Sequence, residues 1–423
     1  MPPTADPPHI SPRSAPESAF ERIGCPDCGL VQRLPPPGPD QVAECMRCGR
    51  TLAGPATGHV TAPLALAVAA LLLLVPATIE PLMVVSTYGA RRSTVLPASA
   101  AAMWHDGFPS LGLLVGVFSI VLPFVFLALL IRVLASLQLG RRSGVGPAFR
   151  WTKHLRPWVM IEVYLVGGFV AYSRINMMTS VEIGSGGWCL VAASLVMLVA
   201  LIQLDDRTVW QMLGRPRSAA ADTGIVCCTV CDLAVPVAAG ERHCPRCRAA
   251  LGHRKPQSLQ CTTALVVAGY LLYLPANVLP VLTTVRLGHE ERNTILSGVV
   301  ELARNDLWPL AVIVFTASIV LPLVKLFGLS WMLLEIRRGS ARYLIGRTRL
   351  YRLIDTVGRW SNIDVFAVAA LVALLQFGEL TAVHAGNGLI AFAAVVVITM
   401  VATMMFDSRL MWDASRSGYD RRP

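Results

Sequence analysis

The chain has 423 residues, of which 54% are hydrophobic and 15% are charged. A soluble domain carries about a quarter of charged residues, so this composition excludes an ordinary soluble protein and indicates a membrane protein. The formal net charge of +11 is spread over short basic blocks at the ends of apolar runs, which is typical of cytoplasmic loops and argues against nucleic-acid binding. Residues 1–24 are polar and rich in Pro and Ser, without the apolar core of a signal peptide, so we expect a disordered N-terminal tail.

Eight of the eleven cysteines form four Cys-x-x-Cys pairs, two pairs in each half of the chain. The first set is Cys25, Cys28, Cys45 and Cys48, and the second is Cys228, Cys231, Cys244 and Cys247. Four thiolates at this spacing form a closed tetrahedral site, so we predict two zinc-ribbon-like knuckles, at 25–58 and 225–254, with one Zn²⁺ each. Iron in an S₄ site has the same ligands and stays open as the alternative metal. A redox dithiol would need only one pair, with a neighbouring βαβ pattern that the sequence lacks.

Matching segments follow the two cysteine sets in the same order, at an offset of about 200 residues. The pairs of matching segments are 76–81 with 275–280, 119–123 with 318–322, 158–164 with 360–366, and 205–210 with 407–412. The sequence therefore predicts an all-α integral membrane protein made of two tandem repeats, with membrane units at 59–212 and 255–412 and a cytoplasmic tail at 413–423.

Eight apolar runs, four in each repeat, predict the transmembrane helices, because most reach the 17–25 residues that a bilayer requires. They lie at 63–85, 109–135, 158–178, 187–204, 262–284, 308–334, 360–378 and 388–406. The first run of each unit contains two prolines, Pro76 with Pro81 and Pro275 with Pro280, which predict either a packing kink or a broken helix that lines a cavity.

Loop charge predicts the orientation. The segments 136–157 and 336–359 are rich in Arg, whereas 179–186 and 379–387 contain no Lys or Arg. The positive-inside rule places the basic segments, both knuckles and both termini in the cytoplasm, so the repeat is parallel and not inverted. On the opposite side, 285–307 has an amphipathic pattern that fits either an interfacial helix or a plain loop.

Ionisable residues inside the predicted spans are costly and indicate function. Lys325 lies within an apolar run and Asp364 near the start of the next span, so adjacent helices could pair them. Ser318 shares a helix face with Lys325, and Thr399 lies deep in the last span. In the first unit Phe126 takes the place of Lys325, and Glu162 that of Asp364. We interpret the group as a proton-relay site; snorkelling of Lys325, or a pair that only fixes helix packing, is the alternative.

Four motifs occur together in the chain: the paired knuckles, Leu321-Pro322 followed by Lys325, Trp360-Ser361 followed by Ile363-Asp364-Val365-Phe366, and Phe406-Asp407 followed by Arg409 and Trp412. In combination they resemble the paraquat-inducible protein A family. The resemblance covers nearly the whole chain beyond the tail. In the first unit Glu162 and an altered 204–207 segment match less well.

This resemblance implies a multi-pass protein of a bacterial inner membrane that works with a periplasmic tunnel of MCE domains. It implies that the protein loads or extracts phospholipid, driven by the proton gradient. The chain has no nucleotide-binding P-loop, so we do not expect it to hydrolyse ATP. With the resemblance, we expect a transport protein and not an enzyme. Two alternatives stay open: a scaffold that anchors and regulates the tunnel, and a thiol redox protein.

Overall fold

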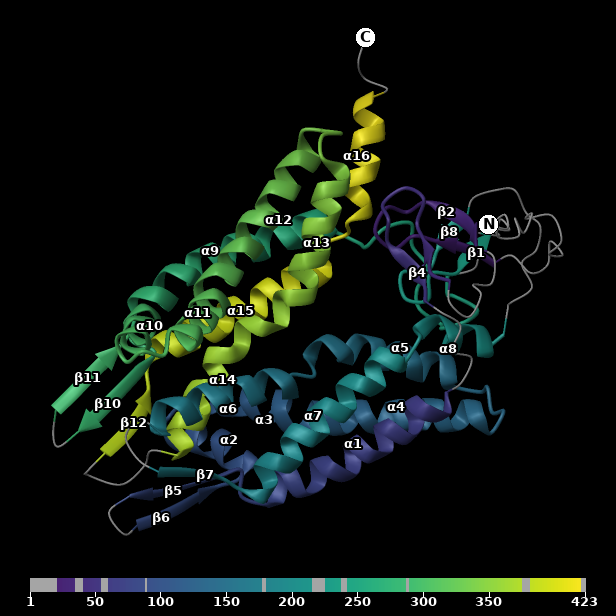
Figure 1. The fold of residues 1–423 in the computed structure, drawn as a ribbon. Helices are drawn as coiled ribbons and strands as arrows, with labels where there is room; N and C mark the ends of the chain where they lie inside the picture. The colour runs from purple at the N-terminus through teal and green to yellow at the C-terminus, as the bar shows by residue number, and fades with distance from the viewer. Residues whose placement is uncertain are drawn as a thin grey trace, which may run out of the picture.

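In a computed structural model, the chain forms two helical bundles that lie side by side, with small β-structured knuckles at one end and two β-sheets at the other (Figure 1). The structure describes residues 21–34, 41–54, 60–87, 90–176, 180–214, 225–236, 242–286, 289–374 and 381–419. Most of the expected N-terminal tail, 1–20, lies outside the described residues. Its last four residues, Glu21–Gly24, form strand β1 of the first knuckle, in contrast to the prediction.

The elements of the two repeats correspond one to one. The first unit contains α1 (Thr61–Ile79), β5 (Met83–Thr87), β6 (Ala90–Thr94), α2 (Leu96–His105), α3 (Pro109–Gly116), α4 (Leu122–Gln138), α5 (Val145–Leu155), α6 (Ile161–Asn176), β7 (Ser180–Ile183), α7 (Ser185–Gln203) and α8 (Asp206–Met212). The second contains α9 (Ser258–Val278), β10 (Leu282–Arg286), β11 (His289–Asn293), α10 (Ile295–Arg304), α11 (Trp308–Phe315), α12 (Leu321–Arg337), α13 (Leu344–Val357), α14 (Ile363–Leu374), β12 (Thr381–Ala385), α15 (Asn387–Met405) and α16 (Arg409–Tyr419).

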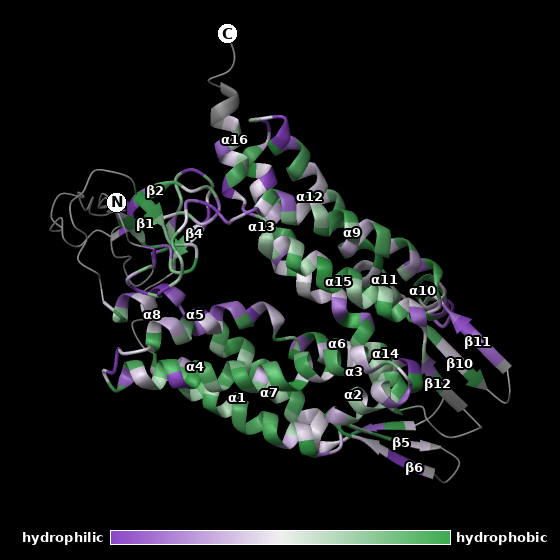
Figure 2. Ribbon diagram, turned by 180° about the vertical axis from the view of Figure 1, so that it is seen from behind, coloured by the Kyte–Doolittle hydropathy of each residue, from purple (hydrophilic) through white to green (hydrophobic). Residues whose placement is uncertain are grey.

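Eight helical stretches among the described residues are long and apolar enough to span a bilayer, four in each unit, as the sequence predicts. Apolar residues cover these helices along most of their length, and polar residues gather toward the ends of the bundles (Figure 2). In each unit the third span is a bent helix, Val145–Asn176 or Leu344–Leu374. Much of the Arg-rich segments that we expected as loops is therefore helical, as α5 and α13.

Proline shapes two places in each unit. Pro76 and Pro275 lie inside α1 and α9, but Pro81 and Pro280 follow the ends of these helices, so the first span contains one proline and not two. Pro322 has no N–H to bond to the carbonyl of Ser318, and the residues Thr316–Val320 form a π-helical turn between α11 and α12.

A three-stranded antiparallel sheet, which the sequence analysis missed, closes the far end of each unit. The strand orders are β6-β5-β7 and β11-β10-β12. The third strand of each sheet comes from the connection between the third and fourth spans, as in the pairing of Val85 with Val181. After each hairpin comes a short helix, α2 or α10, so the helix that was one of two possibilities for 285–307 is present.

The two units meet mainly through their third spans, α6 and α14. Gly167 makes the close approach possible, because a Cβ atom at this position would lie 2.9 Å from the backbone nitrogen of Ala367 and 2.9 Å from the oxygen of Ile363. Next to this contact, the rings of Tyr164 and Phe366 pack edge to face at 5.7 Å. The centre of the molecule is thus a pair of equivalent helices, one from each repeat.

Candidate functional site

Each set of four cysteines comes together in a buried cluster. The sulfur atoms of each set lie within 4.8 Å of one another, and the Cys25–Cys48 and Cys228–Cys247 pairs are 3.5 Å apart. The edge of a Zn–S₄ tetrahedron is about 3.8 Å, so both clusters fit a metal ion without rearrangement. Hairpins hold the ligands: β1 with β2 (Val31–Leu34) and β3 (Ala43–Glu44) with β4 (Thr51–Ala53) in the first knuckle, and β8 (Ile225–Cys227) with β9 (Ala234–Pro236) in the second.

The first knuckle docks on the second membrane unit. Arg352 of α13 donates from Nε to the Asp27 carboxylate at 2.6 Å, and from Nη2 to the Cys48 carbonyl and sulfur at 3.1 Å each. Ser408 donates to the Asp27 carbonyl at 3.0 Å. The guanidinium of Arg47 lies 4.4 Å above the Trp412 ring.

The second knuckle docks on the first membrane unit in the corresponding way. Arg150 of α5 donates to the carbonyl of Arg248 at 2.8 Å. Lys153 donates to the carbonyl of Val230 at 3.0 Å. The knuckles also touch each other, because the Gly24 N–H donates to the Asp232 carbonyl at 3.1 Å. Each unit therefore carries the cysteine cluster of the other repeat.

The 406–412 motif stabilises the C-terminal end of the last span through hydrogen bonds and an ion pair. Asp407 accepts from Nε and Nη2 of Arg409 at 2.8 and 2.7 Å and from the Lys255 N–H at 3.0 Å. Burial alone would raise the pKa of Asp407, but the hydrogen bonds and charge of Arg409 hold it below its usual value. Lys255 binds the carbonyl oxygens of Met404 and Phe406 at 2.7 and 3.0 Å, where α15 ends.

Lys325 is buried in α12, with 2% of its surface exposed. Its ammonium group donates to the carbonyl oxygen of Gly358 at 2.6 Å. Gly358 begins the 3-10 segment Gly358–Asn362, where the third span of the second unit bends. The bend leaves this carbonyl outside a regular α-helical ladder, so it is available to the lysine.

Asp364 lies six residues after Gly358, at the start of α14. No ion pair joins Asp364 to Lys325 in the described part of the chain, so the direct pair that we expected from adjacent helices does not form. Asp364 lies instead beside the Ser318 hydroxyl, although the two groups lack the geometry of a formed hydrogen bond. It also faces the charge of Arg174, which comes from α6 of the first unit and donates to the Gly298 carbonyl at 3.2 Å.

The other predicted residues lie on three further helices. Thr399 is buried in α15 and packs toward Gly269 of α9, next to Leu326. Glu162 begins α6, as Asp364 begins α14, and is half-buried. Phe126 is buried where the second unit has Lys325, so the first unit has an apolar residue in place of the ammonium group.

The sequence profile of paraquat-inducible protein A matches residues 60–214 and 259–416, which include both membrane units. The chain belongs to the paraquat-inducible protein A family. Intermembrane transport protein PqiA of Escherichia coli (strain K12) is 32% identical to it over 406 residues, which cover 93% of this chain and 96% of the relative. Lipophilic envelope-spanning tunnel protein A of the same strain is 31% identical over 410 residues, covering 96% and 94%.

A probable intermembrane transport protein of Haemophilus influenzae is 27% identical over 415 residues. No solved structure matches the chain. These relatives align with the chain along nearly their whole length, and several are named as transport proteins. With the eight candidate spans, they support the assignment of the chain as a multi-pass transport protein of the paraquat-inducible protein A family.

The sequence did not predict which residues make contacts from one repeat of this family member to the other. Arg174 lies near Asp364 although 190 positions separate them, and Asp27 meets Arg352 from the other half of the chain. The sequence did contain one signal for Arg174, because a lone arginine near the end of an apolar span needs a partner. It contained none for the backbone carbonyl of Gly358.

Proposed function

We propose that this chain is an inner-membrane transporter that loads or extracts phospholipid for a periplasmic tunnel of MCE domains, coupled to the proton gradient. The full-length similarity to proteins named for intermembrane transport and for a lipophilic tunnel supports the class of cargo. In this proposal, both knuckles and the basic helices α5 and α13 face the cytoplasm. The sheet end of the molecule then faces the periplasm, toward the tunnel.

One observation carries the proposal: Lys325 is buried in a membrane span, and among the described residues its one hydrogen-bond partner is the backbone carbonyl of Gly358. Burying an ammonium group in such a site costs desolvation free energy, and proteins retain such groups where the charge has a function. Lys325 contacts the bend of the third span, and Asp364 lies one turn and a half further along the same segment. A proton gained or lost at either residue would change the forces on α14, which packs on α6 of the other unit.

The coupling needs no metal chemistry. We infer that the two cysteine clusters hold structural Zn²⁺, because four buried thiols leave no open position for a substrate. When bound, the metal supplies the folding energy of each small knuckle. Transport, and neither catalysis nor thiol redox chemistry, is the activity that this arrangement supports.

The test is lipid transfer by the purified chain with its tunnel partner, reconstituted in vesicles under an imposed pH gradient. Lys325→Met and Asp364→Asn remove one ionisable group each at nearly constant volume, and we expect each to reduce transfer to the level of protein-free vesicles. Glu162→Gln, at the corresponding place in the first unit, is the matched control and should retain most of the activity. Full transfer by both second-unit variants would refute the coupling and favour the scaffold.

A further inference from the structure

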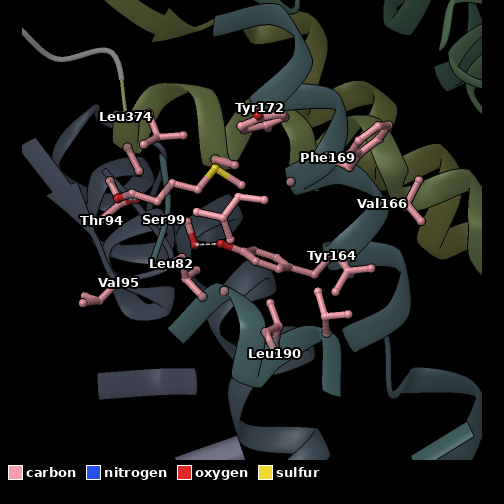
Figure 3. Close-up of a pocket in the computed structure, with 18 residues that line it drawn as sticks. Leu82, Thr94, Val95, Ser99, Tyr164, Val166, Phe169, Tyr172, Leu190 and Leu374 are labelled. Atoms are coloured by element: carbon pink, nitrogen blue, oxygen red, sulfur yellow. Dashed lines mark hydrogen bonds between the residues drawn. The ribbon is translucent and has the colours of Figure 1, made fainter. Parts of the chain in front are cut away.

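An apolar cavity of about 270 Å³ lies in the first unit, between α2, α6, α7 and the end of α14. Figure 3 shows the side chains of Leu82, Val166, Leu190 and Leu374 around it. The residues from β5, β6 and β7 in its wall place it at the sheet end of the spans. A cavity of this size and apolar lining is large enough to admit part of a hydrocarbon ligand, because packed interiors seldom leave voids larger than a water molecule.

The hydroxyl groups deep in the cavity are already paired. Tyr164 donates to Ser99 at 3.3 Å, as the dashed line in Figure 3 shows, and Ser99 donates to the Leu96 carbonyl at 2.8 Å. Thr94 donates to the carbonyl of Met83 at 3.4 Å. These hydroxyl groups already donate hydrogen bonds within the protein, so the interior of the cavity favours a hydrocarbon ligand over a polar one.

The cavity opens at the surface of the bundle. Phe169 and Ile183 belong to its wall, yet they are 57% and 42% exposed. Phe169 stacks with Tyr172 of the next turn, with ring centroids 6.4 Å apart, and Tyr172 also lines the cavity. Exposed aromatic rings near the end of a span lie where acyl chains meet headgroups.

In the second repeat, larger side chains occupy the position that corresponds to this cavity. Its corresponding cavity, formed by α10, α14, α15 and the end of α6, measures about 40 Å³. The repeat offset puts Leu389 at the place of Gly187 and Phe392 at that of Leu190, and Arg174 from the first unit reaches into the same space. One repeat therefore keeps an open apolar cavity where the other contains side chains and a charge.

We propose that the first-unit cavity binds one acyl chain of a membrane lipid, which enters from the bilayer past Phe169. The inference rests on the proposed lipid transport and names the place where the cargo is held. The two repeats then have different roles: the first unit binds the acyl chain, and the second contains the ionisable groups Lys325 and Asp364.

The experiment uses the full chain in vesicles of phosphatidylethanolamine and phosphatidylglycerol that contain a phospholipid with a photoreactive diazirine on its acyl chain. After irradiation, mass spectrometry of peptides locates the labelled residues. We expect the label to be concentrated in 164–172 and 187–191. Leu190→Phe copies the filled second repeat and should reduce this labelling about tenfold, because the ring displaces several methylene groups of the ligand. Ala373→Phe fills the cavity from α14 and should act alike.

Leu195→Phe is the matched control, because Leu195 lies on the same helix, is 58% exposed and does not line the cavity. It should leave the labelling unchanged. A wild-type pattern without excess label in the cavity would overturn the proposal, as would full labelling of both filled variants. Lipid transfer by the wild type without label in the cavity refutes the acyl-chain site alone. Label in the cavity without any transfer supports the site and refutes the transport function.

Discussion

Arg352, in the second membrane unit, donates to both the carbonyl oxygen and the sulfur of Cys48, in the first knuckle, at 3.1 Å. Arg150 makes the corresponding contact from the first unit to Arg248 of the second knuckle at 2.8 Å. Because each knuckle rests on the other repeat, the metal clusters link the two bundles at the end opposite the sheets. If each knuckle docked on its own unit instead, only the connecting chain would join the two bundles at the knuckle end.

The purified protein should contain about two metal ions per chain, with zinc the predominant element, because each cluster offers four buried thiols. Elemental analysis gives the number and the identity. Cys25→Ser with Cys28→Ser should reduce the content by half and leave the second cluster filled. Absence of both zinc and iron in protein made with ample metal would refute the assignment.

Loss of the Arg352 contacts should make the first knuckle release its metal faster. Arg352→Met removes the hydrogen bonds to the Asp27 carboxylate and to the carbonyl and sulfur of Cys48. Hydrogen bonds of a charged group are worth about 1.5–3 kcal/mol each, so release to a chromogenic chelator should accelerate at least about tenfold. Arg349→Met is the control, because Arg349 lies on the same helix and is exposed. Equal release rates for the two variants would show that the crossed contact does not stabilise the cluster.

Gly358→Ala should weaken transport without unfolding the protein. The backbone of Gly358, at φ −54°, accepts alanine. Its Cβ atom, however, would lie 3.2 Å from Cε of Lys325, so the ammonium group must shift by a few tenths of an ångström. We expect a partial loss of lipid transfer, smaller than that of Lys325→Met, at unchanged metal content. Unchanged transfer would indicate that the position of the ammonium group is not critical.

The cysteine clusters and the spans could be predicted because regular Cys-x-x-Cys spacing and long apolar runs depend on local sequence alone. The strands could not, since Val85 pairs with Val181 across about 100 residues, and the starts of β5 and β10 continue the apolar runs 63–85 and 262–284 that predict spans. The direct pair of Lys325 with Asp364, which the sequence suggested, is absent from the described residues, and Arg174 supplies a charge that acts on Asp364. Helix periodicity gives the face that a residue occupies on its own helix, but it does not show that α6 of the other repeat brings Arg174 to that place.

Asp407→Asn should destabilise the protein at neutral pH, because it leaves the buried charge of Arg409 without its partner, at a cost of about 3–5 kcal/mol. The pKa of Asp407 is depressed below its usual value of 3.8, so its contribution is present above that pH and is lost as the pH falls through the lower folded-state value. Thermal unfolding in detergent should show a constant difference between wild type and variant from neutral pH to about pH 5. Asp413→Asn, at a half-exposed pair with Arg254, should cost about 0–1 kcal/mol. A difference that disappears well above pH 4 would contradict the depressed pKa.

Adjacent glycines on α6 give the sharpest test of how the repeats meet. A Cβ atom at Gly167 would lie 2.9 Å from backbone atoms of α14, whereas one at Gly168 would lie 3.6 Å from Cε of Met83, an ordinary contact with a flexible side chain. Gly167→Ala must therefore push the central helices apart, and we expect a cost of about 1–3 kcal/mol. Gly168→Ala should be neutral or stabilising by up to about 1 kcal/mol, because alanine favours the helix. The measurement is the unfolding temperature of each variant in detergent, with metal content as the check of folding. Equal temperatures for the two alanine variants would show that the units do not pack through this contact, and that α6 and α14 are free to separate without loss of stability.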